Sequence, residues 1–162
     1  MAQFSRSAVL EWSGDVRRGI GTVTGGSDAF RIAASFPRIA GEPEGTTTPE
    51  ELLAASHATC FGIGLRSVIA ERGGSARRVR VTATITAEKG AQGIRVRGSH
   101  LDGVVEELAG IEPDTLGEIG RAAEEGCTIS ILLRASVAIT LAVRIATATT
   151  SNGREKEFGN DE

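Results

Sequence analysis

The chain has 162 residues, which is enough for one domain with its own hydrophobic core. Its 40% apolar and 24% charged residues are typical of a globular protein, and a net charge of -3 argues against general nucleic-acid binding, which usually needs a basic face. No run of about 18 apolar residues predicts a membrane span, and residues 1–9 lack the apolar core of a secretory signal, so we expect a cytoplasmic protein with no membrane partner.

The first part of the chain predicts three short strands. Apolar residues alternate with other residues over 8–12, 19–24 and 30–36, and turns rich in Gly, Ser and Asp separate the three segments. Such short turns favour an antiparallel meander. A loop rich in Gly, Pro, Glu and Thr follows over 38–47.

The clearest local signal predicts a long helix from Pro49 to about Arg72. Thr48 is a good N-cap, Glu51 completes a capping box, and Gly73 suits the position just past the last turn. The body of the helix is apolar on almost every side, which predicts a buried helix. Because one chain of this size would struggle to cover such a helix, we expect an intertwined dimer that holds the helix between two sheets.

The second half predicts a strand over 78–85, a hairpin turn over 88–93 and a return strand from 94. Residues 102–108 fit a helix or a continued strand equally well. Helices are expected over 113–125 and 128–133, and a last strand packed on both faces over 137–145. The pattern is one α+β domain with antiparallel sheet over residues 1–146, and the polar residues 147–162 predict a disordered tail.

Two cysteines, Cys60 and Cys127, and two histidines, His57 and His100, carry most of the possible chemistry. Counting leaves three explanations open: two inert buried thiols, a redox pair joined by the fold, or a zinc site. His57 and Cys60 have the spacing to share a metal, but neither Cys127 nor His100 has a paired ligand nearby. We interpret His57 as a core histidine with satisfied hydrogen bonds rather than as the base for a cysteine.

A reactive Cys60 needs a cation nearby, because it lies far beyond the first turn of its helix, where the helix dipole fades. The best local candidate is Arg38 in the loop before the helix, and Arg17 and Arg18 are rivals. Glu50 is free to clamp an arginine by a bidentate pair. Ten helical residues rise about 15 Å, so on a straight helix Glu50 cannot touch Cys60 of its own chain. Either the helix bends, or the arginine spans the distance between them, or Glu50 acts at the site of a partner chain.

Cys127 directly follows Gly126, at the predicted boundary between two helices. A thiolate is electrostatically favoured at the N-terminus of a helix. Cys127 is therefore a candidate to resolve or accept a disulfide.

Residues 48–61, TPEELLAASHATCF, closely resemble the long-helix motif of the OsmC/Ohr family. Residues 12–19, WSGDVRRG, resemble the first hairpin of that family, and residues 126–130, GCTIS, resemble its second cysteine motif, although the family usually has proline at the position of Thr128. The resemblance runs from about residue 8 to residue 145 and implies that residues 102–108 are strand. The hairpin and the loop over 38–45 look more like the osmotically inducible (OsmC) branch than the organic hydroperoxide resistance (Ohr) branch.

The resemblance implies an OsmC-like α+β fold, with antiparallel sheets around a long buried central helix, in an intertwined homodimer with two active sites at its interface. It also implies a thiol-dependent peroxidase that reduces organic hydroperoxides, and hydrogen peroxide more weakly, without a metal or bound cofactor. Carried over, Cys60 is the peroxidatic cysteine, Cys127 the resolving cysteine, Arg38 the activating arginine (Arg18 in the other branch) and Glu50 the arginine clamp.

The implied cycle forms a sulfenic acid on Cys60 and a disulfide with Cys127, which an external dithiol such as a lipoylated protein reduces. A pocket lined by Phe36, Phe61 and leucines would favour alkyl hydroperoxides. Two rival classes stay open. One is a non-catalytic dimeric scaffold that binds small ligands and has structural thiols, and the other is a zinc protein that uses Cys60, Cys127 and His57.

Overall fold

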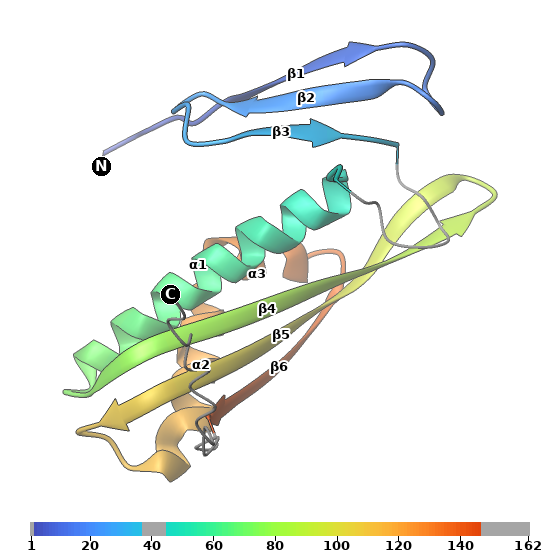
Figure 1. Ribbon diagram of the computed structural model, residues 1–162. Coiled ribbons are helices and arrows are strands. Elements are labelled where there is room, and N and C mark those ends of the chain that lie inside the picture. The colour runs from blue at the N-terminus through green and yellow to red at the C-terminus, as the bar shows by residue number, and fades with distance from the viewer. Residues whose placement is uncertain (1, 37–44, 147–162) are drawn as a thin grey trace, which may run out of the picture.

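The computed structural model describes residues 2–36 and 45–146. It contains two three-stranded sheets, one long helix and a group of short helices (Figure 1). Two sequence predictions, Arg38 as the activating arginine and a disordered tail over 147–162, fall outside the described residues.

The N-terminal sheet consists of β1 (Ala8–Ser13), β2 (Ile20–Gly25) and β3 (Arg31–Ala34), paired antiparallel in that order. The predicted meander is therefore confirmed. In the turn between β1 and β2, an Asp15 carboxylate oxygen accepts the backbone N–H groups of Arg17 and Arg18 at 2.8 and 2.9 Å. This sheet lies beyond the start of the long helix and apart from the second sheet (Figure 1).

The long helix α1 spans Pro49–Glu71, as the capping signals predict. The Thr48 hydroxyl accepts the N–H of Glu51 at 3.4 Å, and Gly73 follows the helix with φ +79°, a conformation that glycine adopts without strain. The second hydrogen bond of a capping box, from the Thr48 N–H to the Glu51 carboxylate, is replaced by another contact. The Glu51 carboxylate accepts the hydroxyl of Thr47 at 2.7 Å, which ties the incoming loop to the first turn.

The second sheet has the order β4 (Ser75–Gly90), β5 (Gly93–Ala109) and β6 (Ala138–Ile145). β4 and β5 form one long antiparallel hairpin, so residues 102–108 are strand, as the resemblance implies. The predicted antiparallel pairing holds for this hairpin and for the N-terminal sheet, but β6 departs from it and pairs parallel to β5. The intervening helices carry the chain back before β6 starts, and this is the connection that a parallel pair needs.

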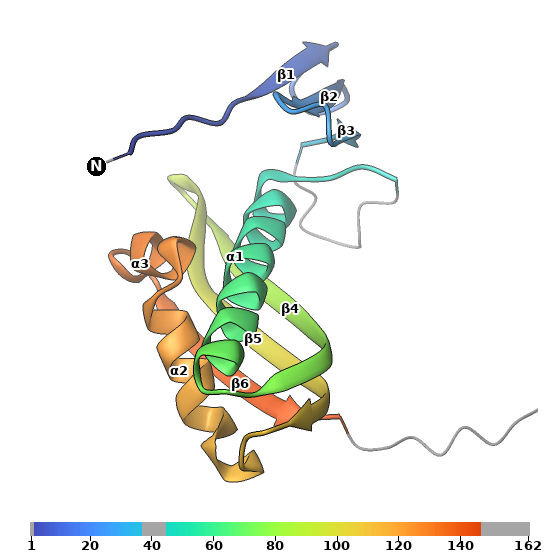
Figure 2. The same cartoon turned by 90° about the vertical axis from the view of Figure 1, so that its left-hand side faces the viewer.

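Three short helices form that connection: η1 (Pro113–Thr115), α2 (Leu116–Glu125) and α3 (Thr128–Arg134). α2 and α1 lie side by side over one face of the second sheet (Figures 1 and 2). Only that face is covered among the described residues. The last strand β6 alternates half-buried and exposed residues, so the prediction that both of its faces are packed is wrong.

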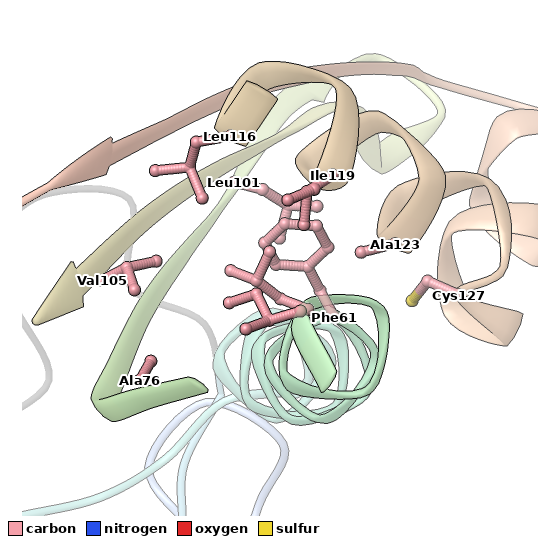
Figure 3. Close-up of a cluster of buried hydrophobic side chains, with 10 residues drawn as sticks. Phe61, Ala76, Leu101, Val105, Leu116, Ile119, Ala123 and Cys127 are labelled. Carbon is pink, nitrogen blue, oxygen red and sulfur yellow. The ribbon is translucent and has the colours of Figure 1, made fainter. Parts of the chain in front are cut away.

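The core lies between α1, α2 and β5. Phe61, Leu65 and Ile69, each one turn apart on α1, are at most 2% exposed and meet Leu101 of β5 and Ile119 of α2 (Figure 3). Within the described chain α1 is thus buried along one stripe, and the expectation that a partner chain covers its other side stays untested.

The opposite side of α1 stays open, and Ile63 on that side is 68% exposed. By length and composition α1 could cross a membrane, but core helices of globular proteins pass the same test. Large apolar side chains are also exposed on the N-terminal sheet, among them Val9, Leu10 and Ile20. Exposed apolar side chains on two elements are consistent with an interaction face.

Candidate active site

The fold brings Cys60 and Cys127 together although 67 positions separate them in the sequence. Cys60 lies in the middle of α1, and Cys127 is the N-cap of α3, which packs beside α1. Both thiols are free, and they lie close enough for each to shift the pKa of the other. Cys127 is 2% exposed, whereas Cys60 is only partly buried. A peroxide or thiol reagent therefore has its access through Cys60.

The start of α3 favours the ionised form of Cys60. Burial works against a thiolate there, but the N–H of Ile129, the thiol of Cys127 and the N–H of Thr128 all hydrogen-bond to the Cys60 sulfur. Together they hold the pKa of Cys60 below its ordinary value. The departure from the family motif thus has a chemical consequence, because a proline in place of Thr128 would supply no N–H.

Cys127 is shifted in the opposite direction. Burial and the hydrogen bond with Cys60 raise the pKa of Cys127, and they outweigh the N–H and hydroxyl of Ser130, which favour the thiolate. The Ser130 N–H lies 3.5 Å from the Cys127 sulfur. In the resting pair, Cys60 is therefore the better thiolate and Cys127 the thiol.

This asymmetry predicts the pH dependence of alkylation. We expect the midpoint of the alkylation rate of Cys60 to lie at lower pH than that of Cys127, and we expect Thr128→Pro to move the midpoint of Cys60 upward, since proline removes one N–H donor but fits the first turn of a helix. Peptide-resolved mass spectrometry after iodoacetamide pulses measures both midpoints. A midpoint of Cys60 at or above that of Cys127 would contradict the assignment.

His57 is a fully buried histidine with both ring nitrogens satisfied. Its Nδ1 lies 2.8 Å from the Ser99 hydroxyl on β5, and its Nε2 lies 2.8 Å from the Ser130 hydroxyl on α3. Burial lowers the pKa of His57, although the carboxylate of Glu124 works in the other direction. The imidazole is therefore neutral near pH 7, in agreement with its interpretation as a core histidine.

The described residues give little support to a zinc site. Both nitrogens of His57 are engaged by serine hydroxyls, so the ring has no free lone pair to donate to a metal ion. The other histidine, His100, is exposed on β5 and pairs with Thr140 at 2.7 Å. Within residues 2–36 and 45–146, no three His, Cys, Asp or Glu side chains gather into a metal-binding group.

An apolar pocket of about 740 Å³ opens beside Cys60, between α1, the start of α3 and the N-terminal sheet. The expected lining is wrong in detail: Phe61 is fully buried in the core, and Phe36 does not line the pocket. Its apolar wall comes from the N-terminal sheet and from α1. The side chains that line it are Ala8, Val23, Phe30, Ile32, Leu52, Ala55, Ser56, Thr59, Cys60, Thr128 and Ile129.

The arginine and glutamate predictions stay untested. Arg38 lies outside the described residues, and Arg18 is exposed in the turn that Asp15 holds. Glu50 occupies the first turn of α1, ten positions before Cys60, so a straight helix keeps the two about 15 Å apart. In the part of the chain that the structure describes, the groups that lower the pKa of Cys60 are N–H and thiol donors rather than an arginine.

Sequence reasoning missed four contributors to the site. The N–H donors of Thr128 and Ile129 depend on how α3 packs against α1, which no local pattern encodes. Ser99 and Ser130 left a weak signal. Ser99 is a polar residue on the inward face of a strand, and Ser130 stands at the third position of a helix that a cysteine caps.

The fold and the site define a two-thiol α+β protein with an apolar pocket at the more exposed thiol. Residues 41–142 match the model of the OsmC-like protein family. Peroxiredoxin OsmC of Escherichia coli (strain K12) is 31% identical over 128 residues, which cover 79% of this chain and 89% of that protein, and peroxiredoxin OsmC of Shigella flexneri matches to the same extent. The chain belongs to the OsmC family.

Solved structures agree with this fold. An organic hydroperoxide resistance protein OsmC from Legionella pneumophila superposes with a TM-score of 0.70 at 24% identity, covering 89% of this chain and 99% of that one. The organic hydroperoxide resistance protein OhrB of Bacillus subtilis superposes with a TM-score of 0.68 at 23% identity, covering 88% of this chain and all (100%) of that one. The family model and the relative from Escherichia coli thus confirm the family predicted from the sequence motifs, and the solved structures confirm the fold.

Proposed function

We propose that this protein is a thiol-dependent peroxidase that reduces organic hydroperoxides to alcohols. The observation that carries the proposal is the contact between the two thiols, in which the accessible Cys60 has the lowered pKa and the buried Cys127 the raised one. One thiolate facing solvent and one thiol held against it are the two groups that a two-cysteine peroxidase needs. Homology to peroxiredoxin OsmC supports the same activity.

In the proposed cycle, the Cys60 thiolate attacks one oxygen of the O–O bond. The alkoxide leaves and takes up a proton as the alcohol, and the sulfur becomes a sulfenic acid. Cys127 then attacks that sulfur, so that a Cys60–Cys127 disulfide forms and water is released. An external dithiol, such as that of a lipoylated protein, restores both thiols by exchange. Arg38, clamped by Glu50, is our candidate for the cation that assists the first step.

The pocket supports organic hydroperoxides as the preferred substrates. Its wall beside Cys60 is formed mostly by aliphatic and aromatic side chains, such as Val23, Phe30 and Ile32. An alkyl or aryl group bound there would gain free energy by burying its apolar surface, whereas hydrogen peroxide has none to bury.

We also propose that the working form is an intertwined homodimer in the cytoplasm. The exposed apolar side of α1 around Ile63 and the apolar residues of the N-terminal sheet support the dimer, since a second chain would cover both. Such a partner would also close the open side of the pocket.

One mass-spectrometric experiment tests the catalytic proposal and the dimer. Wild-type protein and Cys127→Ser are each treated with one equivalent of cumene hydroperoxide, and free thiols and masses are then counted. We expect the wild type to lose both thiols to an internal disulfide and the variant to stop at an oxyacid on Cys60. A native spectrum of the same sample should show twice the mass of one chain.

The alternative is a non-catalytic scaffold that uses the pocket to bind a small apolar ligand. It predicts that both thiols stay reduced after the hydroperoxide treatment and that Cys127→Ser behaves as the wild type does. That result would overturn the peroxidase proposal.

A further inference from the structure

A continuous line of buried polar side chains runs from the second sheet to Cys127. Ser99 on β5, His57 on α1 and Ser130 on α3 are 3%, 0% and 0% exposed, and the two serine hydroxyls each lie 2.8 Å from one nitrogen of the imidazole. Ser130 in turn contacts Cys127, because its N–H lies 3.5 Å from the Cys127 sulfur, and its hydroxyl also acts on the pKa of that thiol. The proposed cycle uses the two cysteines but assigns no role to Ser99, His57 and Ser130.

The hydrogen-bonding capacity of the line gives it a direction. A neutral imidazole donates from one nitrogen and accepts at the other. When Nδ1–H of His57 donates to Ser99, the hydroxyl of Ser130 donates to Nε2, and the Ser130 oxygen keeps a free lone pair. At rest the S–H of Cys127 donates to the Cys60 sulfur. Once Cys60 is a sulfenic acid, that S–H is released and can donate to the Ser130 oxygen. Every polar atom is then satisfied, and a proton path leads from the sulfur to Nε2.

We propose that His57 is a positioning residue that takes the proton of Cys127 through Ser130 as Cys127 attacks Cys60. The inference rests on the proposed two-cysteine cycle and assigns the proton transfer within it. The S–H proton moves to the Ser130 oxygen, and the hydroxyl proton of Ser130 moves to Nε2 of His57. The new thiolate forms the disulfide bond, and hydroxide leaves the Cys60 sulfenic acid. His57 then returns its proton, so that the net product is water.

The surroundings of His57 disfavour proton transfer from Cys127 to His57 in the resting protein, so the transfer takes place only as the disulfide forms. Burial lowers the pKa of His57 and raises the pKa of Cys127, so both stay neutral until the disulfide forms. Among the described residues, the charged group that acts on His57 is Glu124 of α2, whose carboxylate favours the imidazolium and pairs with Arg134 at 2.7 Å.

The other elements packed against His57 contribute neutral hydroxyls, Ser99 from β5 and Ser130 from α3. The titratable neighbours are then the two thiols themselves. A resting thiol at Cys127 would leave Cys60 as the sulfur that meets peroxide first.

An aromatic disulfide tests the relay without any peroxide. With dithiobis(nitrobenzoate), attack by Cys60 releases one coloured thiolate, and attack by Cys127 on the mixed disulfide releases a second one. Stopped-flow absorbance separates the two rates, and Cys127→Ser, which should release only one, identifies the second as that of Cys127. The second rate therefore reports the nucleophilicity of Cys127 directly.

We expect Ser130→Ala and His57→Gln to keep the first rate within about twofold and to slow the second by roughly 100-fold near neutral pH, the low end of general-base effects. The loss should recover as the pH is raised, because Cys127 then ionises without help. Ser130→Thr, which keeps a hydroxyl, should retain most of the wild-type second rate. His100→Gln, at the exposed histidine, is the matched control and should leave both rates unchanged.

A second rate that stays at the wild-type value in both relay variants overturns the inference, as does a loss that higher pH does not recover, which would indicate a structural role. The result is separable from the peroxidase proposal. If the relay variants slow the second rate but Cys60 does not react with hydroperoxides, the relay is supported and the peroxidase proposal is wrong. If Cys60 reduces hydroperoxides but the relay variants keep the wild-type second rate, only the relay is wrong. A single release from wild-type protein removes both.

Discussion

Cys60→Ser is expected to lower the rate of organic hydroperoxide reduction by roughly 10⁴-fold or more, because the variant loses the nucleophile itself. The N–H groups of Thr128 and Ile129 favour a thiolate at this position, but a serine hydroxyl stays protonated at neutral pH and these donors cannot replace its proton. Consumption of cumene hydroperoxide in the presence of a dithiol measures the effect.

The partner variant separates nucleophile from resolving thiol. Cys127→Ser should still consume one equivalent of hydroperoxide per chain in the first turnover, since Cys60 and its N–H donors are retained. It should lose turnover only where regeneration depends on the internal disulfide. Full activity of Cys60→Ser, or a complete loss of the first turnover in Cys127→Ser, would show that the roles are assigned wrongly.

Phe61→Ala is expected to lower the free energy of unfolding by about 3–5 kcal/mol, the range for a phenylalanine deleted from a packed core. The Phe61 ring is 0% exposed and fills the space between α1, α2 and β5, where Leu101 and Ile119 meet it (Figure 3). Few neighbours can move into that space, because they sit on three different elements. Urea unfolding of the purified variant, followed by far-ultraviolet circular dichroism, gives the value.

Phe4→Ala is the control, since it makes the same chemical change at a side chain that is 79% exposed. We expect it to change the free energy of unfolding by less than about 0.5 kcal/mol. An equal loss in the two variants would mean that the ring of Phe61 contributes no specific packing. A loss at Phe61 combined with normal thiol chemistry would show that core and site are energetically separate.

Local signals predict most of the elements. The start of α1 follows from Thr48 and Pro49, its end follows from Gly73, and the three N-terminal strands follow from alternation and short turns. These features depend on hydrogen bonds and backbone angles within a few residues, so the sequence alone contains them. The motifs around the two cysteines were likewise sufficient to recognise the family.

The parallel pairing of β6 and the lining of the pocket could not be predicted from local signals, because both depend on tertiary packing. β6 alternates as a strand would in either direction, and the direction depends on where α2 and α3 deliver the chain. Phe61 and Phe30 are equally apolar in the sequence, yet one fills the core and the other lines the pocket. Phe61 lies on the stripe of α1 that packs on the second sheet, whereas Phe30 lies just before β3 of the N-terminal sheet.

The sequence by itself thus determined the elements, the family and the identity of the two thiols. Only the tertiary structure decided which sulfur ionises more easily. Cys60 lies in the middle of a helix, where its own helix offers no free N–H, and the donors that favour its thiolate come from Thr128 and Ile129, far away in the chain. Electrostatic and hydrogen-bond effects act over a few ångströms of space whatever the separation in sequence, so the chemistry of the pair is settled by packing.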